Sequence, residues 1–207
     1  MAELFKNKFR IPSARLPGYD YGQPGFYFVT ICAELRVCYF GDVLDGEMVL
    51  NDAGKIVLNE LLKTPQIRPN VTLDEFVVMP NHLHIIIIIN EIRSTTSVAA
   101  GLVAESESVV ETHCNASLHE RPRHDDKPYH NKFGPQRNNL ASIVRGFKST
   151  TTKQINKKYG HKYFAWQSRF YDHIIRDEIS YNNIQYYIQQ NPAKWWRDRN
   201  NHEGLLM

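Results

Sequence analysis

The 207-residue sequence predicts an α+β fold built on one antiparallel sheet. Runs of β-branched and aromatic residues alternate with runs of helical periodicity, in the order strand, hairpin, helix, strand, strand, helix, strand, helix. An Asp-Gly dipeptide at 45–46 marks the hairpin, because both central residues of a type I′ turn need positive φ. With 42% hydrophobic and 12% aromatic residues, the chain has enough apolar side chains for a sizeable core.

The boundaries of these elements follow from cap and turn residues. Asn51 can cap the first helix, and Pro65 is expected to stop it. Pro192 disfavours helical geometry at Asn191 and so ends the last helix. The expected strands are 25–32, 37–44, 47–50, 72–79 and 82–89, with an extended stretch at 163–175. The expected helices are 51–63, 138–157 and 178–190.

The order of elements predicts a topology as well as a class. Setting the hairpin aside as an insertion leaves βαββαβ, the ferredoxin-like arrangement of an antiparallel sheet with helices on one face. The other face is then free for a functional site. Residues at about 90–137 are polar and aperiodic, which predicts a mobile, irregular insertion within a single domain of residues 1–207. We expect no active-site residue there, because its histidines are irregularly spaced.

Composition argues against several classes of protein. The strongest apolar run, 85–89, is far shorter than the roughly 18 residues that a membrane-spanning helix needs. The three cysteines include no Cys-x-x-Cys pair, so neither a disulfide framework nor a cysteine zinc site is indicated. The first fifteen residues carry no apolar stretch of signal-peptide length. We therefore expect a cytoplasmic protein with no membrane partner.

A basic stretch between 137 and 176 suits a polyanionic partner. It holds nine basic residues against one acid, and aromatic side chains that could stack on bases lie among them. The candidate DNA-binding residues are Arg145, Lys148, Lys153, Lys157 and Arg169, together with the aromatic Trp166. A solvated helix face would have the same composition, so charge alone does not separate the two interpretations.

The tripeptide His82-Leu83-His84 carries the strongest chemical signal in the sequence. Residues i and i+2 of a strand point to the same face, so both imidazoles can reach one metal ion. Leu83 would anchor the strand in the core and so hold the two rings in place. Histidines that merely find hydrogen bonds in a strand are the alternative, and the tripeptide alone leaves it open.

The last helix places a tyrosine beside a possible further ligand. At about 100° per residue, Tyr187 and Asn191 lie about 40° apart at the edge of the apolar face. A hydroxyl and an amide oxygen could therefore converge on a metal held by the histidines. Tyr186 lies about 140° from Asn191 and points away. A tyrosine at the edge of the core with its hydroxyl in water is the alternative.

Three segments of the chain resemble one family of DNA-processing enzymes. Residues 77–84 (VVMPNHLH) resemble the histidine-hydrophobe-histidine motif of HUH nucleases, specifically the single-tyrosine transposases and their REP-associated relatives. Residues 187–192 (YIQQNP) look like the Tyr-Ile-x-x-Asn-Pro motif of those relatives. The segment before their last helix is matched by Trp166, Gln167, Phe170, His173 and Arg176. The resemblance covers the chain except the insertion, and motif order and spacing agree.

This resemblance implies a ferredoxin-like core and an enzyme that cuts and rejoins single-stranded or hairpin DNA. It also implies Mg²⁺ or Mn²⁺ as cofactor and a covalent 5′-phosphotyrosine intermediate. Carried over to this sequence, Tyr187 is the nucleophile, His82 and His84 are metal ligands, and Asn191 is the third ligand. The family includes monomers and dimers, so a homodimer is left open.

Two other functions are compatible with the same residues. In a metal-dependent phosphoesterase, the histidine pair would activate water and Tyr187 would have no role. Such hydrolases usually add Asp or Glu ligands, and none lies near the histidines in recognisable spacing. A ferredoxin-like sheet with exposed aromatic residues can also bind single-stranded nucleic acid without cutting it. Only a measurement of activity separates these functions.

Overall fold

The structure is a computed structural model that describes residues 16, 18–91 and 138–201. The main sheet contains β1 (Gly25–Cys32), β4 (Val71–Val78), β5 (His82–Ile89) and β6 (Tyr171–Ile175). The helices are α1 (Asp52–Leu62), α2 (Thr64–Ile67), α3 (Leu140–Tyr159) and α4 (Glu178–Gln190). The smaller elements are the hairpin strands β2 (Gly41–Leu44) and β3 (Glu47–Leu50) and the 3-10 helices η2 (Glu34–Arg36) and η3 (Pro192–Arg197).

The sheet confirms the predicted α+β, ferredoxin-like topology. Its strands lie in the order β4-β5-β1-β6, and every neighbouring pair is antiparallel. Without the hairpin and the short helices α2 and η2, the chain order up to the last strand is β1, α1, β4, β5, α3, β6. All eight residues of β5 are buried, as its unbroken isoleucines predicted.

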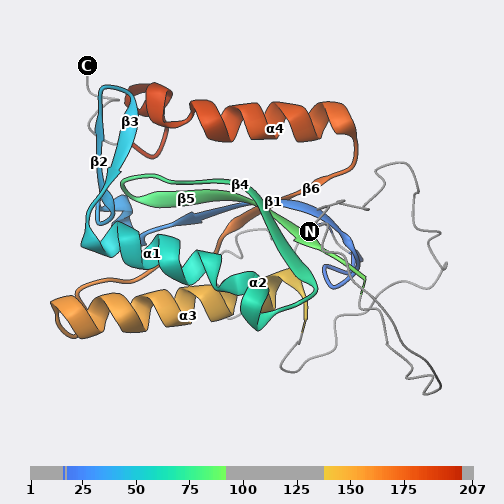
Figure 1. The fold of residues 1–207 in the computed structure, drawn as a ribbon, viewed down its shortest axis with the longest axis horizontal. Helices are drawn as coiled ribbons and strands as arrows, with labels where there is room; N and C mark the ends of the chain where they lie inside the picture. Colours follow the sequence, from blue (N-terminus) through green and yellow to red (C-terminus); the bar gives the residue numbers. More distant parts are fainter. Residues whose placement is uncertain (1–15, 17, 92–137, 202–207) are drawn as a thin grey trace, which may run out of the picture.

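Different helices cover the two faces of the sheet (Figure 1). α1 and α3 lie on one face, where Leu83 of β5 and Ile143 of α3 belong to the larger core cluster. α4 lies across the other face, where Ile188 packs in a smaller cluster with Ile86. The expectation that the second face is free for a site is therefore wrong. α4 covers much of it, and this helix carries Tyr187 to the side of the sheet that the two histidines face.

The hairpin forms at the predicted turn but is shorter than expected. Asp45 and Gly46 have φ values of 52° and 82°, as a type I′ turn requires. Its first arm begins at Gly41 and not at Val37, because the Phe40 N–H donates a hydrogen bond to a loop carbonyl outside the hairpin.

Two further expectations about boundaries are corrected. Pro65 does not end the first helix, because α1 already ends at Leu62 and Pro65 lies in the first turn of α2. A proline is tolerated there since the first N–H groups of a helix have no intrahelical acceptor. The extended stretch at 163–175 pairs with the sheet as a strand only in β6, and Trp166 makes an isolated bridge with Ala33. Most of the insertion expected at about 90–137 lies outside the described residues.

Hydrogen bonds attach one flank of α4 to the edge strand β4. The Tyr181 hydroxyl donates to the Asp74 carboxylate, and Gln185 Nε2 donates to the same carboxylate at 3.2 Å. One turn later, Gln189 Nε2 donates to Glu75 Oε2 at 3.1 Å. The opposite flank of the helix carries Tyr187, whose ring packs against Phe28 of β1 and His84 of β5. Within the described ranges, no helix is long and apolar enough to cross a membrane.

Replacing Ile188 with Ala is expected to lower the free energy of unfolding by about 2–5 kcal/mol, because this side chain is fully buried between α4 and the sheet. Urea unfolding followed by circular dichroism measures the change. Ile179→Ala on the same helix is the matched control, since Ile179 is 75% exposed and its truncation should cost less than about 0.5 kcal/mol. Equal losses in the two variants would contradict the packing described for α4.

Candidate metal and nucleophile site

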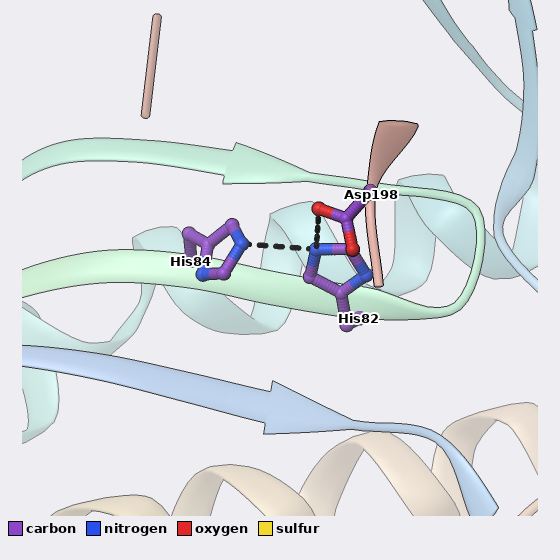
Figure 2. A group of neighbouring side chains, drawn as sticks. All are labelled: His82, His84 and Asp198. Atoms are coloured by element: carbon purple, nitrogen blue, oxygen red, sulfur yellow. Dashed lines mark hydrogen bonds and ion pairs between the residues drawn. The ribbon is translucent and has the colours of Figure 1, made fainter. Parts of the chain in front are cut away.

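The two predicted histidines face each other on β5. His82 and His84 are 0% and 3% exposed, and their Nε2 atoms lie 3.0 Å apart (Figure 2). Leu83 between them points to the opposite face and is fully buried in the larger core cluster. The strand therefore presents both imidazoles on one face, as its period of two predicted.

A buried amide fixes the orientation of His82. Asn81 Nδ2 donates to the carbonyl oxygens of Arg36 and Asn200, both at 2.8 Å, so Asn81 Oδ1 faces the imidazole. This oxygen lies 2.8 Å from His82 Nδ1 and can only accept a hydrogen bond. His82 Nδ1 must then carry the proton, which leaves a lone pair on Nε2. Such a partner behind a histidine is typical of metal ligands.

A hydroxyl holds the second imidazole with less restriction. Thr30 Oγ1 lies 2.9 Å from His84 Nδ1 and is itself buried. A hydroxyl can donate or accept, so His84 can present either an N–H or a lone pair at Nε2. When His84 Nε2 carries the proton, it can donate a hydrogen bond to the lone pair on His82 Nε2. When His84 Nε2 carries a lone pair instead, it can act as a second metal ligand.

Both imidazoles are neutral at pH 7. Burial lowers the pKa of His82 to about 3, and the positive charges of Arg36 and Arg199 act in the same direction. Burial also holds the pKa of His84 well below its usual value, with His82 as the next cause. Neutral imidazole is the form of histidine that binds metal ions.

A carboxylate that the sequence did not predict completes the group. Asp198 follows η3, and its Oδ2 lies 3.9 Å from His82 Nε2 (Figure 2). One ligand atom each from His82, His84 and Asp198 lies within 4.8 Å of the others, so the three residues could hold one metal ion. The segment around Asp198 is held in place by the hydrogen bond from Asn81 to Asn200 and by that from Arg36 Nη1 to the Arg199 carbonyl.

Tyr187 lies against the histidine pair. Its hydroxyl is 3.2 Å from His84 Nε2, and its ring packs edge-on against His84 and Phe28. Burial raises the pKa of the phenol, as does the Asp198 charge, so the hydroxyl is protonated at neutral pH. Tyr186 is 59% exposed and packs against the Lys194 ammonium, so it points away from the site as predicted.

Asn191 is the remaining predicted ligand. It caps α4, is 4% exposed, and its Oδ1 has no hydrogen-bond partner among the described residues. Its amide lies close enough to Tyr187 to lower the pKa of that phenol. An unpaired buried oxygen of this kind is a suitable ligand for a divalent ion, because Mg²⁺ and Mn²⁺ favour oxygen ligands. The residues present therefore fit the metal that the resemblance implied.

The predicted DNA-binding residues differ in exposure and in their contacts. Arg145, Lys153 and Lys157 are exposed, but α3 carries them on the face of the sheet opposite Tyr187 (Figure 1). Arg169 is also exposed and lies in the loop before β6. Contact of these four residues with DNA stays a prediction.

The other two predicted DNA-binding residues, Trp166 and Lys148, have structural roles instead. Trp166 is 8% exposed, packs on Phe40 and donates from Nε1 to Thr151 Oγ1 at 2.8 Å, so its ring is not available to bases. Lys148 Nζ donates to the Gln167 and Arg169 carbonyls, and burial lowers its pKa to about 8. In sequence alone, both residues look like members of a basic, aromatic DNA-binding stretch.

Comparison with known proteins reveals a relative over nearly the whole chain. A Haemophilus influenzae protein described as uncharacterized is 38% identical over 191 residues, which cover 90% of this chain and 91% of that protein. The chain belongs to the same family as this protein. No protein-family model matches the chain.

Two solved structures are similar in fold. A REP-associated tyrosine transposase bound to a REP hairpin has a TM-score of 0.49 and 19% identity, covering 89% of this chain and 74% of that one. A Deinococcus radiodurans protein described as a candidate transposase has a TM-score of 0.40 and 13% identity, covering 84% of this chain and 95% of that one.

Acid is expected to destabilise the protein through the two buried histidines. Both are neutral in the folded state, whereas in the unfolded chain they gain a proton near pH 6.5. Below that pH the unfolded state binds more protons, so the free energy of unfolding should fall by up to about 1.4 kcal/mol per pH unit for each histidine. Urea unfolding between pH 7 and pH 5, with a chelator present, measures this slope.

Replacement of one histidine provides the comparison. His84→Gln should show about half the slope of the wild type between pH 6.5 and pH 5, because one of the two buried titrating groups is gone. His161→Gln, at an exposed position, should leave the slope unchanged. A wild-type stability that does not vary over this range would show that the imidazoles are not buried as described.

Proposed function

We propose that this protein is a metal-dependent nuclease and strand transferase that cuts and rejoins single-stranded DNA, with Tyr187 as its nucleophile. The observation that carries the proposal is the 3.2 Å approach of the Tyr187 hydroxyl to His84 Nε2, beside a group able to hold a metal. A nucleophile next to a cation-binding group is the arrangement that phosphoryl transfer needs. Hairpin-forming repeats as the substrate follow from the sequence resemblance alone.

The metal would be Mg²⁺ or Mn²⁺, held by His82, His84 and Asp198, with Asn191 as a further oxygen ligand. A divalent ion held by these residues would neutralise charge that builds on the scissile phosphate and would help to orient that group for in-line attack. Asn81 keeps the His82 imidazole in the orientation that directs its lone pair toward His84.

Basic side chains beside the histidines provide a second source of positive charge. The Arg36 and Arg199 guanidinium groups are close enough to lower the pKa of His82. Guanidinium groups recognise phosphate oxygens through charge-assisted hydrogen bonds. We therefore expect these two arginines, and not only the predicted basic residues of α3, to contact the DNA backbone near the scissile bond.

The chemical step exchanges one phosphate ester for another. The Tyr187 oxygen bonds to phosphorus while the bond from phosphorus to the 3′-oxygen breaks. The phenol loses its proton and the departing 3′-oxygen gains one, so no further reactant is needed. A 3′-hydroxyl of a second strand can then attack the phosphotyrosine and restore the free phenol, which joins DNA without ATP.

One observation favours a second candidate, the water-activating phosphoesterase. Asp198 supplies the carboxylate ligand that such hydrolases usually have and that the sequence did not reveal. The hydrolase would leave the contact between Tyr187 and His84 without a role, and we therefore rank it second. A nucleic-acid-binding module without catalysis would explain neither that contact nor the group formed by His82, His84 and Asp198.

Tyr187→Phe should abolish formation of a covalent protein-DNA adduct, because the variant lacks the attacking oxygen. The variant should still fold and bind Mn²⁺, since the ring and its packing against Phe28 are retained. The measurement is a denaturing gel of the protein incubated with labelled single-stranded DNA and Mn²⁺, followed by mass spectrometry of any trapped peptide.

Tyr186→Phe is the matched control, because it removes the hydroxyl of the adjacent and outward-facing tyrosine. This variant should form the adduct as the wild type does. A nucleotide found on Tyr186 or Tyr181 would overturn the assignment of the nucleophile. DNA cleavage that persists in Tyr187→Phe without any adduct would establish the water-activating hydrolase.

Asp198→Asn is expected to weaken Mn²⁺ binding at least 10-fold, because it removes the one anionic group among the proposed ligands. Isothermal titration calorimetry measures the affinity. Asp42→Asn, at an exposed position on β2, should leave the affinity unchanged. Normal affinity in Asp198→Asn together with a loss in Asn191→Ala would leave the amide as the third ligand and exclude the carboxylate.

A further inference from the structure

A hollow of about 460 Å³ lies beside the proposed nucleophile, between β6 and the N-terminal half of α4. Its sheet side is formed by Phe28, Tyr171 and His173, and its helix side includes Ser180 and Asn183. The Tyr171 side chain is 45% exposed, so a molecule in the hollow can reach its ring. The predicted functional residues include none of these five side chains.

Strand register places the hollow on the same face of the sheet as the metal ligands. Tyr171 pairs with Thr30, and Thr30 pairs with His84, so the three residues form one row across the sheet. In the next row, Phe28 pairs with His173. Paired residues of neighbouring strands point to the same face. The row that contains the metal ligand therefore ends, at the sheet edge, in the exposed ring of Tyr171.

Phe28 connects the hollow to the reacting groups. Its ring stacks on His84 with centroids 5.5 Å apart, and it meets the rings of Tyr187 and Tyr171 edge-on at 6.1 and 6.3 Å. The same side chain thus contacts the ligand, the nucleophile and the hollow. A single strand whose phosphate lies at Tyr187 has its neighbouring nucleotide within reach of this space.

The helix side of the hollow agrees with this placement. At about 100° per residue, Ser180 and Asn183 lie about 20° and 40° on either side of Tyr187. They are therefore on the flank of α4 that carries the nucleophile, whereas the opposite flank is hydrogen-bonded to β4. The open flank is the side from which a DNA strand can approach.

We propose that this hollow binds one nucleobase of single-stranded DNA, the base next to the phosphate that Tyr187 attacks. The base would stack on Tyr171, and the Asn183 amide, the Ser180 hydroxyl and the His173 imidazole would face its polar edge. Among the described residues that line the hollow, none is lysine or arginine and Asp177 adds a carboxylate, so the hollow suits a base better than a phosphate. This inference rests on the proposed function in taking DNA as the substrate.

Photo-crosslinking tests the proposal without requiring cleavage. The probe is a 20-nucleotide single strand of random sequence in which 5-iodouracil replaces thymine, bound to Tyr187→Phe protein with Mn²⁺. Irradiation should couple the probe to Tyr171, which mass spectrometry of the digested protein identifies. Crosslinks confined to residues outside the hollow would overturn the proposal.

Affinity measurements supply the second arm. In the same background, Tyr171→Ala should weaken binding of the probe roughly 5- to 150-fold, the range found when one base-stacking aromatic is removed. Tyr171→Phe should bind within about 2-fold of the parent, because a phenyl ring also stacks. Tyr186→Ala removes an exposed tyrosine from the far side of α4 and should also bind as the parent does. Unchanged affinity in Tyr171→Ala would overturn the proposal.

The two proposals fail in different ways. If wild-type protein forms no adduct but the probe still couples to Tyr171, the base site stands and the chemistry proposed for Tyr187 is wrong. If wild-type protein forms the adduct and Tyr171→Ala binds and cuts as well as the wild type, the base site is wrong and the chemistry stands.

Discussion

The hydrogen bond between His82 Nδ1 and Asn81 Oδ1 is the interaction on which the site depends. It fixes the proton on one nitrogen of a fully buried imidazole and so directs the lone pair of the other toward His84. The same amide donates to the carbonyls of Arg36 and Asn200, which lie in segments far apart in the sequence. One buried side chain therefore sets the tautomer of His82 and holds together the loops that surround it.

The cost of burying these polar groups is offset by the rest of the strand. Along the α4 side of β5, His82 and His84 are followed by Ile86 and Ile88, and the alternate residues face the larger core cluster. The strand is thus held on both faces, and its polar end cannot move to solvent without exposing several isoleucine side chains. Rigid placement of this kind is what a metal site requires of its ligands.

Sequence alone could predict the fold and the placement of His82, His84 and Tyr187, because those features depend on local periodicity. The period of two in a strand places His82 and His84 together, and the helical period separates Tyr187 from Tyr186. Asp198 could not be predicted, since its approach to His82 depends on hydrogen bonds from Asn81 and Arg36 to the backbone of its loop.

Asp198 was missed from sequence, whereas Trp166 was assigned a role that its burial contradicts. An aromatic residue within a basic stretch has the same sequence pattern whether its ring faces DNA or the core. In the structure the Trp166 ring faces the core, where it packs against Phe40 from the loop before the hairpin. The centroids of the two rings lie 5.2 Å apart. Composition carries no information about such a partner. Sequence therefore overestimated the exposure of the Trp166 ring.

The balance of charge explains why metal and DNA would bind together. The imidazoles of His82 and His84 and the phenol of Tyr187 are neutral at pH 7. Among the proposed ligands, only Asp198 therefore carries a negative charge. The guanidinium groups of Arg36 and Arg199 act on the same atoms with the opposite sign. One carboxylate beside two cations holds a divalent ion weakly, and Mg²⁺ in such sites is completed by phosphate oxygens of the substrate. In the proposed function, each phosphate that enters would add negative charge and ligand atoms at once, so its affinity and that of the metal would rise together by the reciprocity of coupled binding.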